Sequence, residues 1–122
     1  MSLNLSISVA MNKNNVTQSF VQSQTAAMDS AGYKVLSPVL GTSTQQISTA
    51  TIEVAGYAFV RSLVTNTPAT NTVTIGRLDG TTLHEFVQLR PGEPAVLRLA
   101  AGDIGAKAAA EDSRILLGIF ED

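Results

Sequence analysis

The stretch QLRPGEPAVLRLAAGD, residues 88–103, places two prolines around a glycine and a glutamate, directly before an apolar run. Pro91 presets φ for the first corner of a turn and Gly92 supplies a positive φ at the second, which is type II turn chemistry over Arg90–Glu93. Pro94 has no N–H, so a strand can begin there without losing a ladder hydrogen bond. The stretch therefore predicts a rigid structural joint between two strands, either within one sheet or between two sheets.

A β-hairpin is expected before this joint, because Asp79-Gly80 is a strong hairpin turn signal. A two-residue turn would pair Leu78 with Thr81. A three-residue loop, with Gly80 left-handed, would instead pair Leu78 with Thr82. We expect the second register because it groups aliphatic side chains on one face, namely Val73, Ile75, Leu83, Val87 and Leu89.

Further strands are expected on both sides of the hairpin. Upstream, Ile47–Val54 and Tyr57–Val64 are separated by Gly56, and the second run is apolar on both faces, as in a central strand of a sandwich. Pro38 interrupts the segment YKVLSPVLGTST, residues 33–44, which predicts a sheet edge or a bend followed by a turn.

Downstream, Ala106–Ala110 has helical propensity, but the run is short and glycines precede it. We expect a strand at Ile104–Ala108, a turn at Glu111–Ser113 and a last strand at Arg114–Phe120. About eight or nine short strands with turn signals between them predict one antiparallel all-β domain over residues 1–122, a sandwich, jelly roll or barrel.

The first residues of the chain alternate in polarity, which predicts a strand with one wet face. This strand over residues 1–12 is either an edge strand of its own sheet or an arm that crosses to a neighbouring subunit. A second strand is expected near Val16–Gln22, followed by a loop that ends at Gly32. The apolar members of the alternation are Leu3, Leu5, Ile7, Val9 and Met11.

Composition limits the function. The chain has 122 residues, a net charge of −2 and no cysteine, which excludes disulfides, thiol catalysis and cysteine-based metal sites. Its basic residues are far apart in sequence, so nucleic acid is not an expected partner. The start MSLNLSISVAMNK, residues 1–13, lacks the features of a secretory signal or a membrane span, so we expect no membrane association and folding in a reducing cytoplasm.

No candidate catalytic, cofactor-binding or metal site emerges from the residue pattern. His84 is the only histidine and is expected to be a partly exposed strand residue, because no ligand cluster surrounds it. A Ser-His-Asp triad is not expected without a Gly-x-Ser-x-Gly elbow. Glu111-Asp112 does not fit a calcium loop. Four acids could converge as the paired carboxylates of a glycoside hydrolase, although we expect them to be solvated separately: Asp79, Glu85, Glu93 and Asp103.

Several stretches resemble small virion structural proteins of tailed bacteriophages. They are GYAFVRSLVTNTPATNTVTIG (56–76), DGTTLHEFVQLRPGEPAVLRLA (79–100), IGAKAA (104–109) and RILLGIFED (114–122), and the most specific part is LRPGEPAVLRL (89–99). The resemblance implies a jelly-roll β-sandwich that acts without catalysis as a head decoration (cement) protein. It implies a homotrimer bound to the major capsid protein, in a virion assembled in the host cytoplasm. It supplies no functional residues, and the chain departs from the pattern at Ala108–Ala110.

Three other hypotheses remain open at this point. A tail or baseplate module would share the same sequence features. A carbohydrate-binding module would need exposed aromatic side chains, for which Tyr33 and Tyr57 are the candidates. A hydrolase would depend on His84.

Overall fold

The computed structural model describes residues 2–27, 32–48, 52 and 54–122, and all regular secondary structure in them is antiparallel β-strand. The predicted all-β class is confirmed. The described residues form eleven strands in three sheets, more than the eight or nine that were expected. The contacts divide the chain into two compact units, Met1–Ala31 and Gly32–Asp122, which are described separately.

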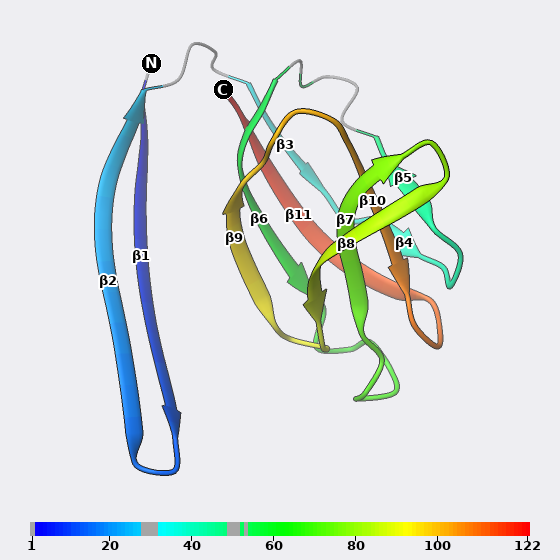
Figure 1. Ribbon diagram of the computed structural model, residues 1–122, viewed down its shortest axis with the longest axis horizontal. Helices are drawn as coiled ribbons and strands as arrows, with labels where there is room; N and C mark the ends of the chain where they lie inside the picture. The colour runs from blue at the N-terminus through cyan, green and yellow to red at the C-terminus, as the bar shows by residue number, and fades with distance from the viewer. Residues whose placement is uncertain (1, 28–31, 49–51, 53) are drawn as a thin grey trace. The chain divides into compact units, whose positions relative to one another are not determined.

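The first unit is a long β-hairpin. Strands β1 (Ser2–Lys13) and β2 (Val16–Ala27) pair over their whole length without a register shift (Figure 1). Asn14 and Asn15 join them with φ values of 50° and 67°. Asparagine tolerates this left-handed conformation, which matches the twist of paired strands. The second strand is thus longer than expected, and the first pairs with its sequence neighbour in a sheet of its own.

The second unit contains the other two sheets (Figure 1). One sheet has the order β5-β10-β7-β8, and its strands are β5 (Gln45–Ile47), β7 (Val73–Asp79), β8 (Thr82–Leu89) and β10 (Asp103–Ala108). The other has the order β3-β11-β6-β9, with β4 paired to the start of β11. Its strands are β3 (Tyr33–Leu36), β4 (Val39–Leu40), β6 (Ala55–Ser62), β9 (Pro94–Arg98) and β11 (Ser113–Glu121).

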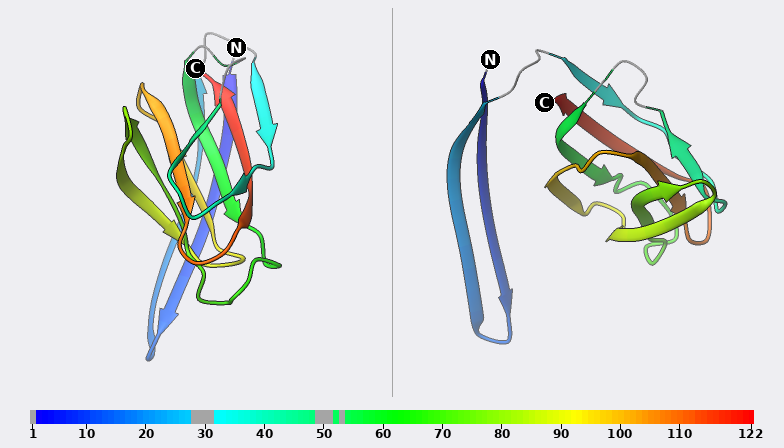
Figure 2. Two further views of the ribbon diagram at one scale, coloured as in Figure 1. Left: turned by 90° about the vertical axis from the view of Figure 1, so that its right-hand side faces the viewer. Right: turned by 45° about the horizontal axis from the view of Figure 1, so that its top comes forward.

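The two sheets enclose one hydrophobic core. Val60, Ile115 and Ile119 from one sheet and Val73 and Ala106 from the other are at most 2 % exposed and belong to the same cluster. The left view of Figure 2 shows the sheets as two layers. The unit is therefore sandwich-like, as the alternating short strands predicted.

The proline-rich joint connects the two sheets. Glu93 N donates to Arg90 O at 3.0 Å and Gly92 has φ +89°, which confirms the predicted turn chemistry. Strand β8 before the turn belongs to one sheet and β9 after it to the other. Gly92 N also donates to Ser62 O at 2.8 Å, which attaches the turn to the end of β6.

Both registers considered for the β7-β8 hairpin are wrong. Leu78 pairs with Leu83 and Asp79 with Thr82, so the loop is Gly80-Thr81, one residue later than expected. Gly80 has φ +60°, in the left-handed region as predicted.

A bulge explains how the aliphatic side chains still gather on one face. Phe86 is an extra residue in β8, and beyond it Ile75 pairs with Val87 and Val73 with Leu89. An inserted residue reverses the facing of every side chain on its far side. The expected grouping of these four aliphatics is confirmed, whereas Leu83 lies on the opposite face with Leu78.

The predicted strand at Ile47–Val54 is wrong where the structure describes it. Strand β5 ends at Ile47, and Ser48, Ile52 and Val54 belong to no strand; residues 49–51 and 53 lie outside the described residues. Gly56 does not separate two strands but lies within β6. Its carbonyl accepts a hydrogen bond from Leu99 N at 2.8 Å.

The remaining strand predictions are confirmed. Strands β10 and β11 match the two expected near the carboxyl end. Pro38 lies between β3 and β4, and both of these strands pair with β11 at the edge of the sheet. Strand β6 is central, as expected, between β11 and β9.

Two asparagines attach the loop between β6 and β7 to the segment around the start of β11. Asn66 Nδ2 donates to Arg114 O, and Asn66 Oδ1 accepts from Arg114 N, both at 2.8 Å. Asn71 Nδ2 donates to Ser113 Oγ at 2.8 Å, and Asn71 Oδ1 accepts from Ala110 N at 2.9 Å. These side chains replace a strand ladder where the chain changes direction.

None of the residues that the structure describes forms a helix of the length and apolarity needed to span a membrane.

Candidate interaction surfaces

The only histidine is close to one acid and is solvated. His84 Nε2 lies 4.0 Å from Asp79 Oδ2, and the two side chains are 61 % and 78 % exposed. Asp79 precedes the Gly80-Thr81 loop of the β7-β8 hairpin, and His84 lies in β8 opposite Arg77. The geometry is that of a surface contact between polar side chains, which contributes little to stability.

The other candidate acids have separate partners. Glu85 Oε1 lies 2.9 Å from Lys107 Nζ across the sheet, and Glu93 Oε2 accepts from Arg90 N at 2.8 Å within the joint. Asp103 begins β10. Over the described ranges, no group of three or more histidine or acidic residues is placed to hold a metal ion. The structure therefore does not gather Asp79, Glu85, Glu93 and Asp103 into one site.

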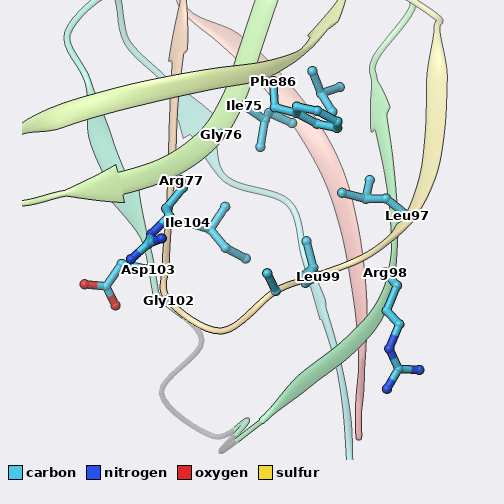
Figure 3. Close-up of a pocket in the computed structure, with 12 residues that line it drawn as sticks. Ile75, Gly76, Arg77, Phe86, Leu97, Arg98, Leu99, Gly102, Asp103 and Ile104 are labelled. Carbon is cyan, nitrogen blue, oxygen red and sulfur yellow. The ribbon is translucent and has the colours of Figure 1, made fainter.

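An apolar pocket of about 310 Å³ opens between the two sheets, beside β8 and β9. In Figure 3 the side chains of Ile75, Phe86, Leu97, Leu99 and Ile104 surround it, and the guanidinium of Arg98 points away. Its other lining residues are Gly76, Arg77, Val87, Ala100, Gly102 and Asp103. The pocket walls are mainly apolar, and the Asp103 carboxylate lies at the rim.

The solvent side of the five-stranded sheet carries a continuous row of exposed apolar residues. One row crosses four strands: Val96 pairs with Phe59, Phe59 with Gly118, and Gly118 with Val35. Val96, Phe59 and Val35 are 43 %, 38 % and 60 % exposed. No heavy atom lies within 4 Å of the position that a Cβ would take on Gly118, so the row has a shallow depression at that strand.

Two further exposed groups extend this row. Tyr33 and Phe120 pair across β3 and β11 and stack with ring centroids 6.1 Å apart. Val39 on β4 is 46 % exposed. We call the whole surface the outer face, made up of Tyr33, Val35, Val39, Phe59, Val96, Gly118 and Phe120.

Basic side chains lie along the outer face. Arg61, Arg98 and Arg114 are exposed and lie at positions of β6, β9 and β11 that face the same side as the apolar row. The Arg98 guanidinium lies 5.3 Å from the centre of the Tyr57 ring and is paired with Asp122. The hydrogen bond that the Arg98 guanidinium donates to Asp122 raises the pKa of Arg98 above its ordinary value. The outer face thus combines an apolar centre with cationic groups.

The hairpin has a second exposed apolar surface. All odd-numbered residues of β1 from Leu3 to Met11 are aliphatic or methionine, and they share one side of the hairpin with Val16 and Phe20. Val9, Met11 and Phe20 are 43 %, 66 % and 53 % exposed. The opposite side carries mainly serine, threonine and asparagine. The predicted strand with one wet face is therefore confirmed, and its apolar side is uncovered within the hairpin.

Comparison with known proteins gives no match: no protein-family model fits the chain, and no curated protein and no solved structure is significantly similar to it.

Sequence reasoning located the apolar alternation of β1 but missed the outer face as a surface. It described the Tyr57–Val64 run as apolar on both faces, whereas Phe59 and Arg61 face solvent. The exposed partners Val35, Phe120 and Val96 come from three other strands, so only the strand order brings them together.

Proposed function

We propose that this chain is a non-enzymatic bacteriophage virion structural protein, a head decoration (cement) protein that binds and stabilises the capsid shell. The observation that carries the proposal is the outer face. One side of the five-stranded sheet covers the core, while the other leaves an apolar row open across four strands. Contiguous exposed apolar surface with polar residues around it is typical of sites that bind another protein.

The virion setting is supported by the resemblance of LRPGEPAVLRL, residues 89–99, and the neighbouring stretches to phage structural proteins. The strand order supports the jelly-roll architecture that this resemblance implies. If β3 and β4 are taken as one strand interrupted at Pro38, each sheet of the sandwich has four strands. Of the connections between successive strands, only β7 to β8 stays within one sheet, and such repeated crossing is expected of a jelly roll.

The proposed mechanism is adhesion repeated by symmetry. Burying the outer face against a capsid subunit removes apolar area from water, worth about 25 cal/mol per Å². Arg61, Arg98 and Arg114 favour a partner surface with carboxylates beside an apolar patch, which gives orientation. Each contact with the shell is weak, but copies that are linked to one another bind the shell with a higher combined affinity than a single copy.

The test is binding of full-length variants to capsids that lack the protein. Val35→Asp and Val96→Asp place a carboxylate in the apolar row, and we expect each to lower capsid occupancy at least tenfold in co-sedimentation. Phe86→Asp is the matched control, because Phe86 is 85 % exposed and belongs to the other sheet. The proposal fails if the outer-face variants keep the thermal transition of the unmodified protein and still occupy capsids as it does.

A carbohydrate-binding module is the second candidate, and one observation favours it. Tyr33 is 69 % exposed and stacks with Phe120, which makes an aromatic surface of the kind that sugar rings contact. If the chain is such a module, the unmodified protein should bind a glycan on an array without occupying capsids, and Tyr33→Ala should abolish that glycan binding. A tail or baseplate position would instead appear as a low copy number per particle.

A further inference from the structure

The pocket between the two sheets continues the hydrophobic core toward solvent. Four of its lining residues also pack against the buried core while staying partly accessible, and Figure 3 shows their side chains directed into the same space: Ile75, Leu97, Leu99 and Ile104. Protein interiors are close-packed, so an apolar space of about 310 Å³ is large enough to be a site for another molecule.

The pocket lies where two edge strands separate. Strands β8 and β9 are the last strands of their sheets, and they diverge from the joint that connects them (Figure 1). Phe86 of β8 and Leu97 of β9 line the pocket, and the connection from β9 to β10 adds Leu99 and Gly102. Because no described strand pairs with the open edge of β8 or of β9, a small molecule can enter between them.

One charged side chain faces the pocket from its wall. Arg77 pairs with Ile104 across β7 and β10, and paired residues of an antiparallel ladder point to the same side of the sheet. The Arg77 side chain runs past Gly102, where the position of a Cβ would lie 3.3 Å from Arg77 Nε. Among the residues that the structure describes, Arg77 forms no ion pair. Its guanidinium is therefore available to an anion in the pocket.

The neighbouring charges indicate how much negative charge the site accepts. Arg98 points away from the pocket and is paired with Asp122. The Asp103 carboxylate lies at the rim and would repel a dianion such as a phosphate monoester. A single carboxylate suits Arg77 better, because a guanidinium can donate two parallel hydrogen bonds to it.

The walls indicate the chemistry of the rest of the ligand. None of the twelve described residues that line the pocket has a hydroxyl or amide side chain. A sugar or a nucleoside would bury hydroxyl groups there without hydrogen-bond partners, which costs free energy. A hydrocarbon chain has no such groups, and its burial removes apolar surface from water.

The volume limits the length of this chain. A water molecule takes up about 30 Å³ of the liquid, so the pocket holds roughly ten non-hydrogen atoms. Octanoate is an amphiphilic carboxylate of this size. Longer fatty acid anions would extend beyond the pocket into solvent.

We propose that the pocket between β8 and β9 binds a small amphiphilic carboxylate, the anion of a medium-chain fatty acid. Its carboxylate pairs with Arg77, and its hydrocarbon chain lies among the four aliphatic residues named above. This inference goes beyond capsid binding, because the site lies between the sheets and not on the outer face.

The first test is calorimetric titration of the full-length protein with hexanoate, octanoate and dodecanoate below their micelle concentrations. We expect octanoate to bind about tenfold more tightly than hexanoate, because two more methylenes are buried. Dodecanoate should bind no more tightly than octanoate. An affinity that continues to rise through dodecanoate would indicate adsorption to an open apolar surface and would overturn the proposal, as would the absence of octanoate binding.

The second test concerns the charge at Arg77. Arg77→Gln should lower the affinity for octanoate about tenfold, the effect of losing a charge-assisted hydrogen bond. Arg90→Gln is the matched control, because Arg90 is exposed and does not line the pocket. Octylamine should bind the unmodified protein at least tenfold more weakly than octanoate, and Arg77→Gln should remove this difference. Equal losses of octanoate affinity in the two arginine variants would contradict the pairing.

The third test locates the ligand by amide chemical shifts of the 12.8 kDa protein. Octanoate should shift the signals of Ile75, Leu97 and Ile104. Shifts confined to Val35 or Ile7 would place the ligand on the outer face or on the hairpin, and the proposed site would then be wrong.

These tests are independent of the proposed function. Arg77→Gln should keep full capsid occupancy, and Val35→Asp should keep octanoate binding. Octanoate binding without capsid occupancy would count against the cement proposal alone, whereas capsid occupancy without octanoate binding would count against the ligand site alone.

Discussion

Asn71 shows how one side chain holds two distant segments together. It is 1 % exposed, and its Nδ2 donates to Thr67 O, Glu111 O and Ser113 Oγ at 3.1, 2.9 and 2.8 Å. Its Oδ1 accepts from Ala110 N at 2.9 Å. Both N–H groups of the amide are therefore used within the sandwich, shared among three acceptors, and its oxygen accepts one bond.

Asn71→Ala should therefore destabilise the sandwich strongly. It removes every one of these bonds and leaves a cavity where the buried amide stood, so we expect a loss of about 3 kcal/mol in the free energy of unfolding. Urea denaturation measures it, with the exposed neighbour Thr70→Ala as the control. A loss below that of the control would mean that water replaces the amide.

At the same scale, residues with local partners were predictable and those with distant partners were not. Gly80 and Gly92 were recognised because a turn needs a positive φ within a few residues. The contacts of Asn66 and Asn71 with the start of β11 were not predicted, since these partners lie about forty or more residues further along the chain. A pattern of neighbouring residues in the sequence does not indicate such a distant contact.

Among the elements, the β7-β8 hairpin depends on close approach of two backbones at its bulge. A Cβ on Gly76 would lie 1.9 Å from His84 O and 3.0 Å from Glu85 Cα. Gly118, in contrast, has open space where its Cβ would be. Both glycines lie in strands, so their alanine variants can be compared directly.

Gly76→Ala should separate β7 from β8, because neither backbone atom can move without breaking the ladder. We expect the free energy of unfolding to fall by about 3 kcal/mol, the upper range of overpacking. Gly118→Ala should change it by no more than about 0.5 kcal/mol. Thermal denaturation of both variants checks the difference, and equal transitions would show that the bulge relaxes freely.

The strands themselves were largely visible in the sequence, whereas their registers were not. Alternating polarity located β1, β9 and β11 within a few residues. The β7-β8 register was missed because Phe86 is inserted into the ladder, and an inserted residue changes no local propensity. The sequence also could not place β5 and β6 correctly, since Gly56 looks like a separator but lies inside a strand.

For the whole molecule, the arrangement into a sandwich and a separate hairpin makes a prediction about truncation. Deleting residues 2–11 removes most of β1 but no residue of the hydrophobic core, which begins at Leu40 with Leu36 packed against it. The shortened protein should lose capsid occupancy while keeping the cooperative thermal transition of the sandwich. Unchanged capsid occupancy would contradict a role for this segment as an arm.

The fold class was predictable at this scale because turn signals and β-branched residues are spread over the whole chain. The candidate binding surface was not. The outer face is assembled from β3, β4, β6, β9 and β11, and only the order of the strands shows which of their alternating positions face solvent. Composition could indicate that the protein binds partners, but it could not show which face of the sandwich binds them.

The Gly80-Thr81 loop has a practical consequence for engineering. It is exposed, nothing lies within 4 Å of the position of a Cβ on Gly80, and it belongs to the sheet that does not carry the outer face. A foreign peptide inserted there would extend into solvent from the tip of a rigid hairpin. An antigen or a fluorescent label displayed at this point would be repeated with each copy of the protein and would leave the outer face uncovered.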